Sequence, residues 1–154
     1  MPAGVGYQSE VYPNTRNSFS TKLSASYFLP YRAALFLHYR YFSDSWQIDA
    51  NDIEVSYRHP FGRSIEVELK ARYYQQTKAS FYNDLFPYQD AQNFLARDKE
   101  LSDFDDLTLG LSLTYAIPER FSIENWRSEA SIQWDYITFN YNDFRDPTAE
   151  GAIG

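Results

Sequence analysis

The sequence predicts an all-β fold, an antiparallel up-and-down meander of about six strands that forms part of a transmembrane β-barrel. Three observations point to this class. Apolar and polar residues alternate with period two along several long segments, which is the pattern of strands with two different faces. Aromatic residues make up 19% of the 154 residues, and the 14 Tyr suit surfaces that are apolar on one side and wet on the other. Tight turns containing Pro or Gly separate several of the alternating segments.

The clearest two-faced segment is 63–76. Its odd positions from 65 to 73 are apolar, whereas its even positions carry a serine followed by four charges, Glu66, Glu68, Lys70 and Arg72. An Arg or Lys that faces lipid at the membrane midplane costs about 2–4 kcal/mol. The even face is therefore predicted to meet water, and the odd face an apolar environment.

Composition excludes several other classes. No run approaches the roughly 20 apolar residues of a membrane helix, whereas alternating barrel strands are compatible with a mean hydropathy of −0.57. The net charge of −7 argues against a nucleic-acid partner, because phosphate-binding domains carry a basic excess. The absence of Cys excludes disulfides and thiolate metal sites, and neither a metal nor a cofactor is predicted.

The first part of the chain predicts a loop and a hairpin. Residues 1–17 contain Gly, Pro and Asn without periodicity, so we expect a loop. Alternation over 18–29 predicts the first strand, and Pro30-Tyr31-Arg32 predicts a tight turn. Alternation over 33–41 then predicts its antiparallel partner.

The middle of the chain is harder to place in phase. Ser43-Asp44-Ser45 interrupts the pattern, and alternation is clear again only over 53–58. We therefore expect a long second connection and a β-bulge near Asn51. His59-Pro60-Phe61-Gly62 predicts a second tight turn, which leads into the strand over 63–76.

The last part predicts one long loop and two further strands. Residues 77–105 show no sustained period, so we expect a long extracellular loop with a functional role. The alternating leucines of 107–115 predict the fifth strand, and Ile117-Pro118-Glu119-Arg120 predicts a third tight turn. Alternation over 130–136 predicts the sixth strand. The whole sequence is thus interpreted as a single partial barrel domain, 1–154.

The rhythm of these connections favours a membrane barrel. Short and long connections alternate in the prediction, as in barrels with tight periplasmic turns and long external loops. Apolar-face tyrosines are predicted near both rims, as in the aromatic girdles of such barrels: Tyr27, Tyr57 and Tyr115 near one, and Tyr39, Tyr41, Tyr73 and Tyr136 near the other. The alternative is a soluble lipocalin-like ligand-binding barrel with the apolar face turned inward.

The predicted topology places both chain ends outside the cell. Complete single-chain bacterial barrels normally have at least eight strands and both termini in the periplasm. The residues after Met1 lack the basic and apolar regions of a signal peptide. We therefore expect an excerpt of a longer barrel that cannot close by itself and whose two open sheet edges permit self-association.

Three segments carry a resemblance to a known family. They are residues 39–46, 71–76 and 96–102, which read YRYFSDSW, ARYYQQ and ARDKELS. These segments resemble those of a family of uncharacterised Gram-negative outer-membrane proteins, domain of unknown function 3570, and the similarity spans about 29–144. The resemblance implies a single-chain barrel longer than this sequence, with a signal peptide and an aromatic-rich last strand that this sequence lacks. It supplies no catalytic residues.

The wet faces of the predicted strands carry the candidate site. We expect charged residues on neighbouring strands to form cross-strand ion pairs that line a lumen and set its selectivity for a small solute. A membrane-embedded enzyme built on His38 and a nearby Ser is the less favoured reading, because no catalytic geometry is specified. The lumen-lining candidates are His38, Arg40, Glu54, Arg58, Glu66, Glu68, Lys70, Arg72 and Asp135.

The long loop carries a second set of candidates. The segment Arg97, Asp98, Lys99 and Glu100 is expected to order the loop through local ion pairs, although the two cations could also contact lipopolysaccharide phosphates. The loop acids, which also include Asp103, Asp105 and Asp106, could in principle bind calcium, but their spacing is not that of an EF-hand. The aromatics Phe81, Tyr82, Phe86 and Tyr88 are expected to pack against the barrel, with plugging of its mouth or stacking on a ligand as alternatives.

Together these patterns predict a protein of the bacterial outer membrane that binds or passes a small solute and is not an enzyme. Its expected partners are membrane lipid, lipopolysaccharide and a small solute, with no nucleic acid.

Overall fold

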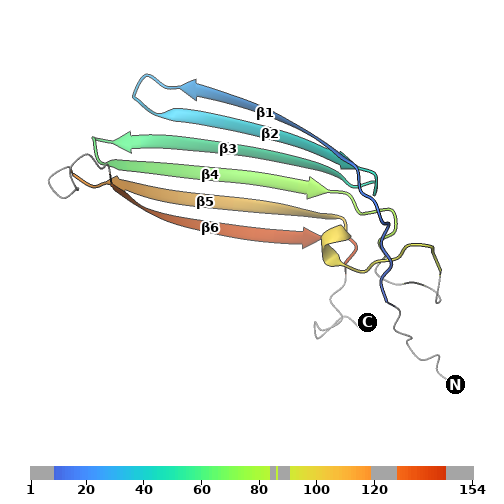
Figure 1. Cartoon of the computed structure of the whole chain (residues 1–154). Helices are drawn as coiled ribbons and strands as arrows, with labels where there is room; N and C mark the ends of the chain where they lie inside the picture. Colours follow the sequence, from blue (N-terminus) through green and yellow to red (C-terminus); the bar gives the residue numbers. More distant parts are fainter. Residues whose placement is uncertain (1–8, 84–85, 87–90, 119–127, 145–154) are drawn as a thin grey trace.

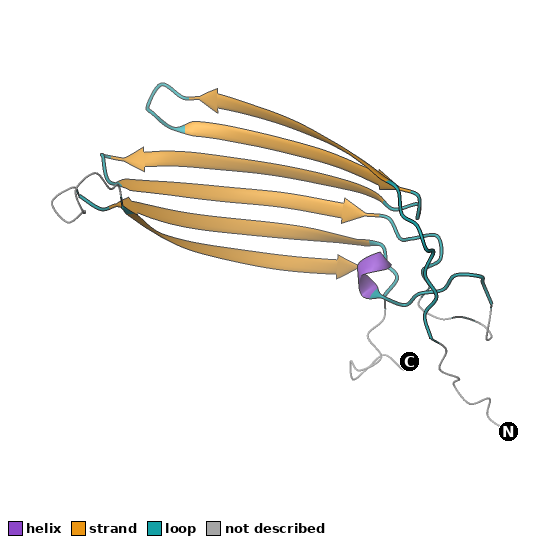
Figure 2. Cartoon of the chain, viewed as in Figure 1, coloured by secondary structure: helices purple, strands orange, loops and turns teal. Residues whose placement is uncertain are grey.

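The computed structural model describes residues 9–83, 86, 91–118 and 128–144. They form one antiparallel sheet of six strands in the order β1-β2-β3-β4-β5-β6 (Figure 1). Its only helix in these ranges is one short 3-10 turn (Figure 2). The elements are β1 (Ser18–Phe28), β2 (Ala34–Asp44), β3 (Asp49–Phe61), β4 (Ile65–Gln76), η1 (Lys99–Leu101), β5 (Phe104–Ala116) and β6 (Glu129–Tyr141). The predicted all-β meander of six strands is confirmed.

The register confirms the predicted two faces. All five strand pairs are antiparallel and in continuous register, so side chains of one parity align across the whole sheet. The apolar face, as we call it, contains the odd positions of β1 to β5 and the even positions of β6. Its central aliphatic residues include Leu23, Leu37, Val55, Leu69, Leu111 and Ile132. The opposite parity forms the polar face, which carries all nine lumen-lining candidates.

The second connection differs from the prediction. Because β2 extends to Asp44 and β3 starts at Asp49, only residues 45–48 join them, and the connection is short. The β2–β3 register runs without interruption from Ala34↔Arg58 to Ser43↔Asp49, so the bulge predicted near Asn51 is absent. Polar residues on both faces near this rim hid the alternation from the sequence pattern.

The second turn also moves. β3 continues through Pro60 to Phe61, which pairs with Ile65, and the turn consists of residues 62–64. The β2–β3 register ends at Arg58, so Pro60, which has no N–H, lies where β3 has only β4 beside it. Gly62 has φ of 67°, a left-handed conformation that glycine adopts without steric cost.

The last two connections are long. Residues 77–103 join β4 to β5, close to the predicted loop, although β5 starts at Phe104 and includes the end of that segment. Residues 117–128 join β5 to β6, so this connection is longer than the predicted tight turn at 117–120. Residues 119 and 120 of that turn lie outside the described ranges. The connections therefore do not alternate strictly between short and long.

The two rims of the sheet are distinct (Figure 1). The connections 29–33, 62–64 and 117–128 link strand ends at one rim, which we call the turn rim. The connections 45–48 and 77–103 lie at the other, the loop rim, where β1 also begins and β6 ends. The start of β1 and the end of β6 thus lie at the same rim, as the predicted strand directions require.

The sheet is open and has two unequal faces. β1 and β6 form its two edges, because the strand order does not close on itself. The described buried apolar cluster lies at the loop rim and consists of Ile48, Ala79, Phe81, Tyr82, Ala96 and Leu101, with Phe42 and Trp46 packed against it. Phe42 belongs to the polar face. The aliphatic residues of the apolar face remain exposed, Leu69 at 53% and Leu111 at 44%.

The tyrosines of the apolar face follow the predicted girdles only in part. Tyr27 and Tyr115 are each second to last in their strands at the turn rim, and Tyr41 lies near the loop rim. Tyr136, by contrast, lies near the middle of β6 and stacks on Trp134 with ring centroids 6.3 Å apart. Its predicted position near the loop rim is wrong, because β6 extends five residues beyond it, to Tyr141.

Candidate functional site

An ion-pair network crosses the polar face near the loop rim. Asp52 on β3 accepts hydrogen bonds from Arg40 on β2 and from Arg72 on β4, with the closest N–O distance 3.0 Å for each. Arg72 also contacts Asp106 on β5 at 3.3 Å. One carboxylate thus neutralises parts of two guanidinium groups, and the network links four consecutive strands.

Three further ion pairs lie toward the turn rim. Arg58 contacts Glu68 at 2.8 Å and Glu66 at 3.4 Å, so one guanidinium group bridges two carboxylates of the neighbouring strand. Lys70 on β4 contacts Asp135 on β6 at 3.1 Å, although β5 lies between these strands. The expected cross-strand ion pairs are therefore present among the candidate residues.

Gly110 on β5 allows the contact between Lys70 and Asp135. Its two register partners are these same residues. A Cβ atom at position 110 would lie 2.8 Å from Cε of Lys70 and would collide with Oδ1 of Asp135. A side chain at this position would therefore displace one of the two charged groups.

The remaining strand candidates make weaker contacts. Nδ1 of His38 lies 2.9 Å from the Ser24 hydroxyl of the adjacent strand. Within the described ranges, no carboxylate hydrogen-bonds the other ring nitrogen, although Glu54 is the register partner of His38 on β3. The structure thus brings a Ser and a His together without a third group that orients the imidazole.

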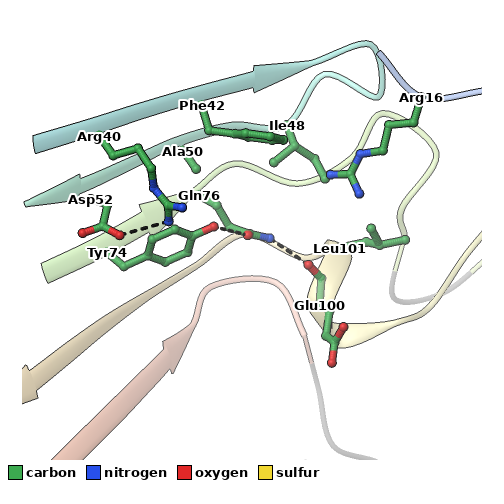
Figure 3. Close-up of a pocket in the computed structure, with 10 residues that line it drawn as sticks. All are labelled: Arg16, Arg40, Phe42, Ile48, Ala50, Asp52, Tyr74, Gln76, Glu100 and Leu101. Carbon is green, nitrogen blue, oxygen red and sulfur yellow. Dashed lines mark hydrogen bonds and ion pairs between the residues drawn. The ribbon is translucent and has the colours of Figure 1, made fainter. Parts of the chain in front are cut away.

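A cavity of about 310 Å³ opens where the polar face meets the loop rim (Figure 3). Strands β2, β3 and β4 contribute most of its wall, while the N-terminal segment and η1 close it from the rim. The lining residues are Arg16, Arg40, Phe42, Ile48, Ala50, Asp52, Tyr74, Gln76, Glu100 and Leu101. The wall thus combines guanidinium groups, aromatic rings and aliphatic side chains.

Gln76 fastens the long loop to the end of β4. Its Nε2 donates to the carbonyl oxygens of Glu100 and Ser102, each at 2.9 Å, and its Oε1 accepts from the Tyr74 hydroxyl at 2.7 Å (Figure 3). Gln76 is buried, so these bonds are shielded from water. The loop turn is thereby held over the polar face.

A helix cap and backbone hydrogen bonds contribute to the order of the predicted loop segment. Asp98 caps η1 by accepting from the Glu100 N–H at 3.1 Å, and the Lys99 carbonyl accepts from the Ser102 hydroxyl at 2.6 Å. The Arg97 N–H donates to the Glu10 carboxylate at 2.8 Å. These contacts fix the backbone around η1, and the expected local ion pairs of Arg97 stay a prediction. Another charged residue of the long loop, Lys78, forms an ion pair with Asp143 at 3.0 Å.

The N-terminal segment packs over the long loop. Val11 and Leu95 exchange two backbone hydrogen bonds of 2.9 Å, and the Tyr12 ring contacts Trp46 and Phe81. Tyr12 donates a short hydrogen bond to Glu10, which raises the pKa of the Tyr12 hydroxyl to about 12. Residues 9–17 thus lack a strand, as predicted, but are held in place by the loop.

The loop aromatics are divided. Phe81 and Tyr82 are buried in the apolar cluster, as expected for packing against the sheet, and Phe86 is half-buried. Tyr88 lies outside the described residues.

Across the described ranges, no three His, Cys, Asp or Glu side chains are grouped so that they could hold a metal ion. No described helix is long and apolar enough to span a membrane.

Comparison with known proteins gives one result. Residues 5–140, which are most of the chain, match the family described as "Protein of unknown function (DUF3570)". The chain belongs to this family. No curated protein and no solved structure matches the chain. The family suggested by the three resembling segments is thereby confirmed for this DUF3570 chain.

The sequence patterns did not predict several residues of the ion-pair network and the cavity in this DUF3570 chain. Asp52 has the same parity as Glu54, but the expected bulge separated it from the strand. Asp106 was placed among the loop acids, although alternation with Thr108 and Gly110 could have extended β5 to include it. No sequence pattern predicted that Arg16, Tyr74 and Gln76 would meet at the loop rim, because this depends on how the loop folds back.

Proposed function

We propose that this chain forms part of an outer-membrane β-barrel whose apolar face contacts lipid and whose polar face lines a lumen for a small solute. One observation carries the proposal. The loop and the N-terminal segment cover part of the polar face, whereas the aliphatic side chains of the apolar face remain exposed. A soluble chain gains free energy by covering its apolar face, because burial of apolar surface is worth about 25 cal/mol per Å².

The extent of exposed surface supports the same reading. Each of the six strands exposes large apolar residues on this face, namely Leu23, Leu37, Val55, Leu69, Leu111 and Trp134. Leu, Ile, Val, Trp and Tyr side chains make up much of the exposed face. An apolar face that extends across six strands indicates a partner, and lipid suits such a broad surface.

Strand length is compatible with a membrane span. The strands contain 11 to 13 residues, whereas a strand tilted by about 45° needs roughly 9–11 residues to cross the hydrocarbon core. Strands in globular proteins usually contain about 5–6 residues. Tyr27 and Tyr115 at the turn rim suit the water interface, because their hydroxyls can stay hydrated.

The polar face supports binding or passage of a small solute rather than catalysis. Its charges form pairs of both signs, which suits a hydrated lumen with defined selectivity. Partners under this proposal are outer-membrane lipid, lipopolysaccharide at the loop rim and a small solute. The exposed edges of β1 and β6 would pair with further strands, from the same polypeptide or from another copy, because lipid does not satisfy open backbone groups.

Single-cysteine labelling tests which face meets lipid, and the chain has no native Cys to interfere. Leu111→Cys and Leu113→Cys on the apolar face are compared with Ser112→Cys and Thr114→Cys on the polar face of the same strand. Each variant carries a nitroxide label in phospholipid vesicles. Oxygen, which concentrates in lipid, should relax labels at 111 and 113 most, and a water-soluble nickel complex should relax those at 112 and 114.

The opposite result would favour the alternative. In a soluble lipocalin-like barrel, labels at 111 and 113 would lie inside a protein core and be shielded from both reagents. Such a chain would also stay monodisperse without detergent. Either finding would remove the membrane assignment.

A further inference from the structure

The cavity at the loop rim contains two guanidinium groups that approach it from different parts of the chain. Arg40 extends from β2, and Arg16 extends from the N-terminal segment on the other side (Figure 3). Both side chains are partly accessible, with exposed fractions of 48% and 41%. A few polar groups placed in a largely apolar pocket fix the orientation of a bound small molecule.

The carboxylates of this region leave guanidinium donors unused. Asp52 is already shared between Arg40 and Arg72, and its side chain is only 16% exposed. Asp44 is fully buried and accepts from Arg16 and from the backbone N–H groups of Trp46 and Ile48. A guanidinium group has five N–H donors, and Arg40 uses one of them, toward Asp52, among the described contacts. A carboxylate entering the cavity would therefore find free donors and few free carboxylates.

The Glu100 side chain does not compensate these cations. Figure 3 shows its carboxylate turned away from the two guanidinium groups, whereas its carbonyl oxygen faces Gln76. The negative charge that lines the cavity therefore comes chiefly from Asp52, which is paired.

The rest of the wall is apolar or aromatic. Phe42 and Tyr74 supply aromatic rings. Ile48, Ala50 and Leu101 supply aliphatic groups, and these three residues are buried. The volume of about 310 Å³ is at the lower end of the range of small-molecule pockets, about 300–1000 Å³. The cavity can therefore surround a small apolar body while the charged end of the same molecule meets Arg40.

We propose that this cavity binds a small organic carboxylate with an apolar body, held at its charged end by Arg40. The inference rests on the proposed function, because it assigns the class of solute that the polar face receives. The carboxylate accepts hydrogen bonds from the Arg40 guanidinium group, a planar donor that can bind both carboxylate oxygens. The apolar body contacts Phe42, Ile48 and Leu101.

Binding of benzoate to the full chain in detergent micelles, measured by calorimetry, tests this assignment. Benzoate should bind at least about tenfold more tightly than benzamide, which keeps the ring without the charge. Acetate, which keeps the charge without the ring, should also bind more weakly. Equal binding of benzoate and benzamide, or no binding of benzoate, would overturn the inference without any variant.

Matched charge removals locate the site. Arg40→Gln should weaken benzoate binding about tenfold or more, while Asp52 retains Arg72 as its partner. Lys22→Gln removes the same charge at the register partner of Arg40 on β1, outside the cavity, and should leave binding unchanged. An equal loss of benzoate affinity in both variants would show that the total charge of the chain causes the effect, and it would refute the site. Circular dichroism reports whether each variant keeps its sheet.

The outcome is separable from that of the proposed function. If the labels at 111 and 113 report lipid but benzoate fails to bind, the barrel stands and the solute class is wrong. If benzoate binds with the expected selectivity and the labels report a protein core, the cavity belongs to a soluble protein.

Discussion

Substitution of one apolar-face residue by arginine would measure the environment of the sheet. Leu111 is the eighth of 13 residues in β5, close to the middle of the strand, and its register partners are Leu69 and Trp134. Leu111 is 44% exposed. Neither of its two register partners is a carboxylate that could compensate a new positive charge. Under the proposed membrane assignment, Leu111→Arg would place a charge in hydrocarbon near the membrane midplane.

The expected cost follows from this depth. Arginine on the lipid face costs about 2–4 kcal/mol at the midplane, which corresponds to a roughly 30- to 1000-fold loss in the folding equilibrium. Leu69→Arg, at the register partner, should cost a similar amount. Ser112→Arg is the matched control, because Ser112 lies next in the chain but on the polar face, between Glu68 and Gln133. The new guanidinium group could pair there with Glu68, so the cost should stay below about 1 kcal/mol.

Reversible urea unfolding of the two variants in phospholipid vesicles, followed by tryptophan fluorescence, measures this difference. Leu111→Arg should lower the unfolding free energy by the larger amount. A larger loss for Ser112→Arg would show that the polar face is the packed one, and the assignment of the two faces would be wrong.

Three further predictions address the loop rim and the ion pairs. Gln76→Leu would leave the carbonyls of Glu100 and Ser102 without their donor, which should cost about 1–3 kcal/mol of stability. Proteolysis within 77–103 should therefore accelerate. The control Gln75→Leu, on the exposed side of the same strand, should leave the rate of proteolysis unchanged. Gly110→Ala should break the Lys70–Asp135 contact and lower stability by roughly 1 kcal/mol in urea unfolding, whereas Ser112→Ala on the same face should be near neutral, and equal effects would refute the role of Gly110. Glu10→Gln should lower the pKa of Tyr12 from about 12 toward 10, as read from the absorbance difference at high pH between each chain and its Tyr12→Phe counterpart. Because the folded-state pKa of Tyr12 is raised, its contribution to stability is complete below pH 10 and is lost as the pH rises through about 12, and an unchanged titration in Glu10→Gln would exclude the carboxylate as the cause.

Period-two alternation predicted the two faces wherever it was unbroken. In β4 and β5 each apolar residue predicted for one face has an apolar register partner, such as Leu69 opposite Leu111. The same parity placed Lys70 and Arg72 on the polar face, where both form ion pairs. Alternation determines a strand's faces because successive side chains point to opposite sides.

The predicted bulge near Asn51 was wrong because a polar side chain there lies on the apolar face of the sheet. Asn51 lies on the apolar face near the loop rim, where it accepts a hydrogen bond from the Tyr39 hydroxyl at 2.7 Å. A polar residue in such a position looks like a change of phase, although the strand is regular. The cavity was beyond reach for a different reason, because Arg16 and Leu101 reach it through the fold of irregular segments that have no period.

The lengths of the connections have a consequence for the order of assembly. Residues 29–33, 45–48 and 62–64 join β1 to β4 through three consecutive short connections, whereas β5 follows only after residues 77–103. Closing a 27-residue loop costs about 2 kcal/mol more chain entropy than closing one of four residues, from the logarithmic dependence on length. Pairing within β1–β4 therefore has the lower contact order and should form first, with β5 and β6 added afterwards. The bond from Gln76 to the Glu100 carbonyl links β4 to the far end of that loop, so its formation would mark the step at which β5 arrives.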